Sequence, residues 1–152
     1  MNPQRPVIVS ACLTGEPCRY DGGHKAHPAI RKLMQEQTVV PVCPEELGGL
    51  GTPRAAAGLE GGDGHSIWAG QARVVNERGE DVTSAFCQGA SRALDIAREC
   101  GAHRAILKAR SPSCGCGRTG GLHGPVEGDG VFSALLRRHG LELLTEEDLP
   151  PS

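Results

Sequence analysis

Three cysteines in this chain share one local setting, in which a short apolar run ends at the entrance to a polar, glycine-rich loop. Thiolate sulfur is both a nucleophile and a ligand for iron and zinc, so this repetition suggests chemistry and not only packing. The richest loop, residues 109–117 (ARSPSCGCG), also carries two serine hydroxyls. The cysteines and their preceding runs are Cys12 after residues 7–9, Cys43 after residues 39–42, and Cys114 after residues 105–107.

The segments around these loops alternate between predicted strands and predicted helices. Short aliphatic runs predict strands at residues 7–10, 39–42, 105–108 and 141–144. Apolar side chains spaced three and four apart predict helices at residues 28–37, 83–100 and 131–139. Two segments, 55–64 and 118–130, show no regular spacing of apolar residues. A small β-hairpin insertion is expected at residues 72–82. We therefore expect an α/β fold over residues 1–152, a single three-layer domain with a mainly parallel, Rossmann- or flavodoxin-like sheet.

Parallel strands bring their carboxyl ends to one edge of the sheet, where ligands bind at the point of reversed strand order. Cys12, Cys43 and Cys114 each follow such a strand end, so we expect them to converge on one site. Three thiolates are enough to hold a [4Fe–4S] cluster by three of its irons, which leaves one iron not ligated by protein. That open iron would be a Lewis acid with a preference for soft sulfur ligands.

Groups that can move protons lie beside these cysteines in the sequence. Glu45 follows Cys43 by two residues and is a candidate general acid or base for water, although Glu46 competes with it. A hydroxyl from Ser111 or Ser113 could hold or relay a proton. Ser113, Asp21 and Arg54 are the residues that we assign to substrate binding.

The remaining cysteines have more ordinary explanations. Cys18, in the loop after Cys12, is a fourth ligand, a redox partner or plain loop. Cys116 is too close to Cys114 for both to bind one iron comfortably. Cys87 and Cys100 lie on or near the apolar face of a predicted helix, which is typical of small buried hydrophobic residues. The chain has no CxxC pair, so a zinc ribbon is only weakly indicated.

Composition limits the partners and the compartment. Sixteen basic and eighteen acidic residues give a net charge of −2, and aromatic residues make up 3% of the chain, so strong nucleic-acid binding is not expected. No apolar run approaches the ~20 residues that span a bilayer. The segment Met1–Pro6 lacks the apolar region of a signal peptide, and seven cysteines without one suggest a reducing compartment, so we expect a cytoplasmic protein. The expected partner is a small molecule, and a homodimer is left open.

Four segments of the chain are similar to one known family. They are residues 9–25 (VSACLTGEPCRYDGGHK), 40–54 (VPVCPEELGGLGTPR), 106–117 (ILKARSPSCGCG) and 126–136 (VEGDGVFSALL). Together, and in this order, they resemble the short thiouracil desulfidases, and the resemblance runs from about residue 7 to residue 149. It is specific because four separate motifs contribute to it.

The resemblance implies an enzyme with a [4Fe–4S] cluster on Cys12, Cys43 and Cys114 and one open iron. It implies removal of sulfur from a thiolated base or nucleoside, such as 2- or 4-thiouracil, without net redox change and with release of hydrogen sulfide. Glu45 matches the family's acid/base carboxylate, and Ser111 matches a serine placed near the substrate.

Two other functions remain as alternatives. One is a sulfur carrier or accessory protein in RNA thiolation, which would use the same iron to hold sulfide for transfer. The other is a non-enzymatic zinc-binding module.

Overall fold

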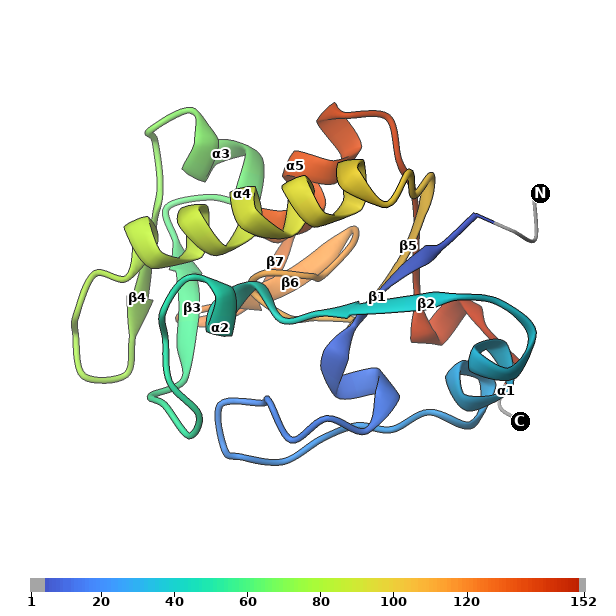
Figure 1. The fold of residues 1–152 in the computed structure, drawn as a ribbon. Coiled ribbons are helices and arrows are strands. Elements are labelled where there is room, and N and C mark those ends of the chain that lie inside the picture. The colour runs from blue at the N-terminus through green and yellow to red at the C-terminus, as the bar shows by residue number, and fades with distance from the viewer. Residues whose placement is uncertain (1–4, 151–152) are drawn as a thin grey trace.

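The computed structural model describes residues 5–150, and strands alternate with helices along this part of the chain (Figure 1). Part of the segment Met1–Pro6, on which the expectation about a signal peptide depends, therefore lies outside the described residues. No helix within residues 5–150 is long and apolar enough to cross a bilayer. The elements in chain order are β1 (Val7–Ser10), the 3-10 turn η1 (Ala11–Thr14), α1 (Pro28–Glu36), β2 (Val39–Val42), α2 (Pro44–Leu47), β3 (Ala57–Glu60), α3 (Gly64–Trp68), β4 (Arg73–Asn76), α4 (Thr83–Glu99), β5 (Arg104–Leu107), β6 (Arg118–Gly121), β7 (Gly124–Glu127), α5 (Val131–Arg138), β8 (Glu142–Thr145) and the 3-10 turn η2 (Glu146–Asp148).

The predicted parallel sheet is present, with four strands in the order β2-β1-β5-β8. Every pair in it is parallel, so the carboxyl ends of β1, β2 and β5 lie at the same edge. The chain leaves β1 toward β2 on one side and later returns to pair β5 on the other side of β1. The strand order therefore reverses between β1 and β5, which is where a ligand site is expected.

Alternate side chains of the sheet enter two different cores. In β1, Ile8 packs in the larger cluster with α4 and α5, whereas Val7 and Val9 pack in a second cluster with Ile30 of α1. This follows from the two-residue period of a strand, because both faces of a parallel sheet are covered by helices. Figure 1 shows α4 and α5 on one side of the sheet and α1 on the other, which gives the predicted three layers.

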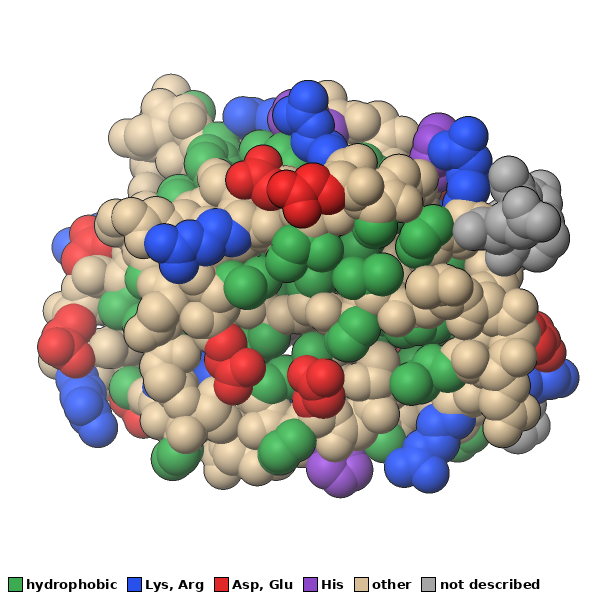
Figure 2. Space-filling view, viewed as in Figure 1, with side chains coloured by type: hydrophobic (Ala, Val, Ile, Leu, Met, Phe, Trp, Pro, Cys, Tyr) green, Lys and Arg blue, Asp and Glu red, His purple; other side chains and the backbone are tan. Residues whose placement is uncertain are grey.

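One edge of this sheet is open. Its edge strand β2 crosses the middle of the view in Figure 1, and Figure 2 shows hydrophobic side chains gathered across the middle of this face. Val39 and Val40 of β2 are half-buried and Pro41 is exposed. Because proline has no N–H to offer a further strand, Pro41 makes this edge a poor template for pairing with another chain.

A second sheet extends well beyond the hairpin expected at residues 72–82. It has four strands in the order β4-β3-β6-β7, and only one bridge, Val75 to Asp81, pairs the two sides of the expected hairpin. The two segments in which the sequence shows no period, 55–64 and 118–130, form three of its strands, β3, β6 and β7. Glycine explains why these strands have no readable period. A Cβ on Gly58 of β3 would lie 2.4 Å from the backbone nitrogen of Leu122, so only a residue without a side chain fits there. The strands pack backbone to backbone, and so the sequence shows no alternating apolar side chains.

The short helix α2 lies in a segment predicted to be a loop, and it packs closely on α4. A Cβ on Gly89 of α4 would lie 1.7 Å from the carbonyl oxygen of Pro44, and one on Gly48 would lie 2.0 Å from the carbonyl oxygen of Ala85. The two backbones approach because neither glycine has a side chain. This contact determines the position of α2, whose first turn contains Glu45.

We expect Gly89→Ala to lower the free energy of unfolding by about 1–3 kcal/mol, since the added methyl group cannot fit without moving α2. Helix propensity alone would change stability in the opposite direction, because alanine is favoured over glycine in a helix interior by about 1 kcal/mol. A destabilised Gly89→Ala variant therefore reports the close contact with α2. Urea denaturation followed by circular dichroism measures the change. The control is Gln88→Ala on the exposed side of the same turn, and equal stabilities for the two variants would contradict the close contact.

Candidate active site

A cavity of about 370 Å³ lies at the carboxyl edge of the parallel sheet, beside the reversal in strand order. Its volume is in the range of small-molecule sites. The loops that follow β1, β2 and β5 form most of its wall. Six of the residues singled out in the sequence line it together: Cys12, Cys43, Glu45, Arg54, Ser111 and Cys114.

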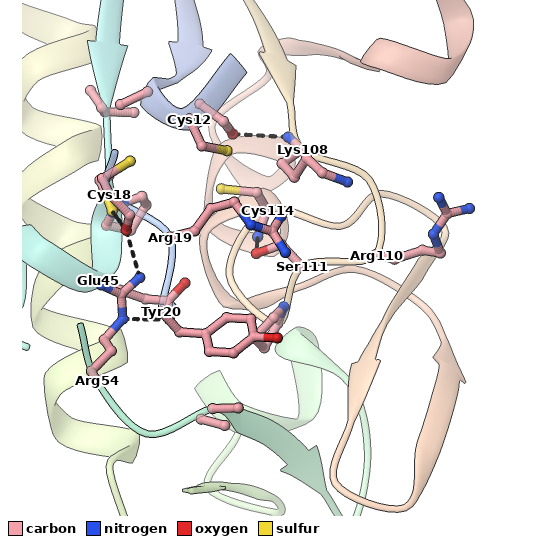
Figure 3. A pocket seen from close by; sticks show the side chains of 18 of the residues that line it. Cys12, Cys18, Arg19, Tyr20, Glu45, Arg54, Lys108, Arg110, Ser111 and Cys114 are labelled. Atoms are coloured by element: carbon pink, nitrogen blue, oxygen red, sulfur yellow. Dashed lines mark hydrogen bonds and ion pairs between the residues drawn. The ribbon is translucent and has the colours of Figure 1, made fainter. Parts of the chain in front are cut away.

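The three cysteines reach the cavity from three different elements. Cys12 lies in η1, Cys43 precedes the first residue of α2, and Cys114 lies in the loop after β5. Figure 3 shows the sulfurs of Cys12 and Cys114 pointing toward one another. A fourth thiol, Cys18, also lines the cavity, and the Cys43 Sγ lies 3.8 Å from the Cys18 carbonyl oxygen.

These thiols differ in acidity because their surroundings differ. Burial raises the pKa of Cys12 to about 11 and raises that of Cys114 well above its usual value. A hydrogen bond from the Cys18 thiol lowers the pKa of Cys43, and the same bond with burial raises the pKa of Cys18. A bound metal would favour the thiolate form of these groups, since it replaces the proton by a positive charge.

The donor atoms around the cavity are mainly thiol sulfurs, which are ligands for iron and zinc. Within residues 5–150, no group of three or more His, Cys, Asp and Glu side chains is placed to hold a single metal ion. In a [4Fe–4S] cluster each cysteine binds a different iron. The donor set of soft sulfurs around one cavity therefore fits an iron–sulfur cluster.

Glu45 lies in the first turn of α2 and is held at both of its oxygens. Its Oε1 is 3.3 Å from the Nε of Arg54, and its Oε2 accepts a hydrogen bond from the Ser113 hydroxyl at 3.4 Å. Burial raises the pKa of Glu45, and the charge of Arg54 offsets this only in part. A carboxyl group in this environment is suited to exchanging a proton with a molecule in the cavity.

Arg54 connects this carboxyl group to the loop that follows Cys12. Its Nη2 donates to the Cys18 carbonyl oxygen at 3.0 Å, and its backbone N–H donates to the Tyr20 carbonyl oxygen at 2.7 Å. The other guanidinium hydrogen bonds go to its own loop, to the Gly51 carbonyl oxygen (3.2 Å) and the Thr52 hydroxyl (2.9 Å). Arg54 lines the cavity, but its donors are largely used by the protein.

The loop with Cys114 is fixed by its own serine and by α5. The Ser111 oxygen accepts the backbone N–H groups of Ser113 and Cys114, each at 3.2 Å. The first N–H groups of α5 donate to the carbonyl oxygens of Pro112 (2.9 Å) and Ser113 (2.8 Å). The Ser111 oxygen acts as acceptor twice, and within residues 5–150 its O–H has no hydrogen-bond acceptor, so it is free to donate to a molecule in the cavity that it lines.

Two of the residues assigned to substrate binding do not line the cavity. The side chain of Ser113 is 1% exposed and instead donates to Glu45. The side chain of Asp21 is 53% exposed, lies 4.0 Å from the Nε of Arg19 and accepts the N–H of Gly23. Cys116 also lies outside the lining and contacts the Cys114 carbonyl oxygen at 3.5 Å.

Sequence reasoning missed several residues of the cavity wall, among them Arg19, Tyr20 and Lys108. The signal that could have identified them is their position next to residues already singled out in the sequence. Arg19 and Tyr20 directly follow Cys18, and Lys108 directly precedes the ARSPSCGCG loop. Lys108 forms an ion pair of 3.0 Å with Glu146 of η2, whose other oxygen accepts the backbone N–H of Ala109.

Comparison with known proteins agrees with this fold. YbbK of Bacillus subtilis (strain 168), an uncharacterized protein, is 44% identical over 146 residues, which cover 94% of this chain and 97% of YbbK. The solved structure of TudS, a [4Fe-4S]-dependent thiouracil desulfidase, matches with a TM-score of 0.84 and 41% identity, covering 97% of this chain and 94% of the TudS chain. The profile of the 2-thiouracil desulfurase family matches residues 7–148. The family resemblance and the α/β fold expected from the sequence are thus confirmed, and the chain belongs to the 2-thiouracil desulfurase family.

Proposed function

We propose that this protein is an iron–sulfur enzyme that converts a thiolated pyrimidine and water into the oxo base and hydrogen sulfide. The observation that carries the proposal is that three strand-end cysteines and a buried glutamate line one cavity, in a chain 41% identical to TudS. The reaction exchanges C=S for C=O by hydrolysis, so it needs no oxidant or reductant. The thiouracils are the substrate class.

Cys12, Cys43 and Cys114 would hold the cluster. When bound, a [4Fe–4S] cluster with three cysteine ligands supplies one iron free of protein ligands, which polarises the thiocarbonyl group as a Lewis acid. The chain contributes the wall of sulfur atoms, which orients the thiocarbonyl sulfur toward that end of the cavity.

Glu45 handles the protons of the reaction. As a carboxylate it takes one proton from the water that attacks the ring carbon and passes it to the departing sulfur. It then takes the remaining hydroxyl proton as C=O forms and the C–S bond breaks, and passes this second proton to the sulfur, which leaves as hydrogen sulfide. The Arg54 guanidinium and the Ser113 hydroxyl hold both of its oxygens, so the carboxyl group keeps one orientation through the exchange. The Ser111 hydroxyl donates a hydrogen bond to the substrate.

A defined first experiment separates this function from its alternatives. The protein is purified and reconstituted anaerobically, iron and labile sulfide are assayed, and sulfide release is followed after adding 2- or 4-thiouracil. The proposal expects about four irons per chain and release of sulfide with formation of uracil. Bound zinc without iron would favour the zinc-binding module. A cluster that transfers sulfide to RNA or a protein partner, but releases none from thiouracil, would favour the sulfur carrier.

We expect replacement of any one of the three proposed ligands by serine to abolish iron retention and activity, because a hydroxyl group is a poor ligand for a soft iron–sulfur centre. Iron and sulfide per chain and the visible absorption of each variant measure the effect. Cys100→Ser is the control, since its sulfur lies against the Ala97 carbonyl oxygen on α4, away from the cavity. Full iron content in a Cys12, Cys43 or Cys114 variant would remove that residue from the ligand set.

We expect Glu45→Gln to keep the iron and lower kcat by roughly 10²- to 10⁴-fold, since glutamine has a similar shape but cannot take up a proton. The control is Glu46→Gln on the same helix, because Glu46 does not line the cavity and bonds Thr52 instead. Steady-state sulfide release measures both variants. Equal rates for Glu45→Gln and the unmodified protein would exclude Glu45 from the proton transfer.

A further inference from the structure

The cavity wall contains one aromatic ring, that of Tyr20, which is the only tyrosine of the chain. Its side chain is 43% exposed, although a ring of this size gains from being covered. Within residues 5–150, the other exposed large hydrophobic residue is Met34 on α1, which does not line the cavity. Tyr20 thus presents a partly uncovered aromatic surface at the wall of this cavity.

Arg19 lies against this ring and has unused donors. Its guanidinium carbon is 5.7 Å from the centre of the Tyr20 ring, a distance typical of a cation–π contact. Its side chain is 23% exposed, and its one ion-pair contact is Asp21 at 4.0 Å from Nε. Among the residues that the structure describes, neither Nη atom has a hydrogen-bond partner. Figure 3 shows the Arg19 side chain extending between Tyr20 and Cys114, toward Ser111.

The backbone that carries both side chains is held at three points. Arg54 binds the carbonyl oxygens of Cys18 and Tyr20, and the Arg19 N–H donates to the Gly23 carbonyl oxygen at 3.1 Å. Little conformational freedom is therefore left to lose when a ligand binds here, which favours recognition. The same Arg54 also holds Glu45, so the pair is placed in a constant relation to the carboxyl group.

We infer that Arg19 and Tyr20 form the wall that recognises the ring of the substrate. A planar heterocycle packs against the flat faces of the guanidinium and the phenol group, and the free Nη donors bind its exocyclic oxygen. This inference rests on the proposed function and narrows its substrates to cyclic, aromatic thioamides. Thiourea is the informative comparison, because it has a thiocarbonyl carbon between two nitrogens but no ring to cover Tyr20.

Binding of uracil tests the wall without depending on turnover. Uracil has the ring and no sulfur, so its affinity reports on the wall and not on bonding of sulfur to iron. Uracil binding to the iron-loaded protein is measured by anaerobic equilibrium dialysis. We expect Tyr20→Leu to weaken it by roughly 5- to 150-fold, the effect of losing one stacking contact, and Tyr20→Phe to bind like the unmodified protein. Arg19→Lys keeps the charge but loses the flat guanidinium and its paired donors, and we expect it to bind uracil more weakly as well.

Three controls make the result decisive. Met34→Leu changes the other exposed hydrophobic residue and should leave uracil binding unchanged. Iron per chain is assayed in every variant, so a loss of binding with full iron is assigned to the wall. With thiouracil, Tyr20→Leu should raise KM more than it lowers kcat, whereas any slow sulfide release from thiourea should not respond to the substitution.

Two outcomes would overturn the inference: no uracil binding by the unmodified protein, or equal binding by the unmodified protein, Tyr20→Leu and Arg19→Lys. Failure of the proposed function would give a different set of results from failure of this inference. In that case the unmodified protein would bind uracil in a Tyr20-dependent way and yet release no sulfide from thiouracil.

Discussion

The hydrogen bonds of Arg54 determine how the parts of the site lie relative to one another. One guanidinium contacts Glu45 on α2 and the Cys18 carbonyl oxygen in the loop after β1, and the same residue's N–H binds Tyr20. These segments lie far apart in the sequence and share no sheet pairing. Arginine suits this position because its planar group has five donors in fixed directions, and its charge also lies beside a buried carboxyl group. The cost of burying each partner is reduced by the presence of the other.

Burial acts on the sulfurs and on the carboxyl group in the same direction. It raises the pKa values of Cys12, Cys114 and Glu45, because an isolated negative charge is unfavourable in this cavity. A positively charged centre among the cysteines reverses this preference for the thiols. Binding of the proposed cluster would therefore change the charge of the cavity wall. The proposed chemistry depends on that change, since Glu45 must accept and release a proton close to these sulfurs.

The parts of the molecule with a regular side-chain pattern could be predicted from the sequence. Side-chain period and boundary residues were enough to predict the strands 7–10 and 39–42 and the helices that begin at Pro28 and Thr83. The parallel topology was enough to predict that three strand-end cysteines converge. The second sheet could not be predicted, because Gly58 and its partners make backbone contacts that have no apolar signature. Asp21, assigned to the substrate, lies outside the cavity, whereas its neighbours Arg19 and Tyr20 line it. Which side chains of an irregular loop point inward is decided by distant hydrogen bonds, here those of Arg54, and no local pattern records them.

The strand order β2-β1-β5-β8 has a consequence for the order of events during folding. Val7 of β1 pairs with Val39 of β2 but also with Arg104 of β5, so the sheet closes only when widely separated segments meet. Contacts of such long sequence separation form slowly and late. Cys12 and Cys43 can be brought together by the first half of the chain, yet Cys114 joins them only after β5 has docked. A nascent chain that still lacks its last third has only two of these three cysteines, so the proposed cluster site cannot be complete before that part has been synthesised.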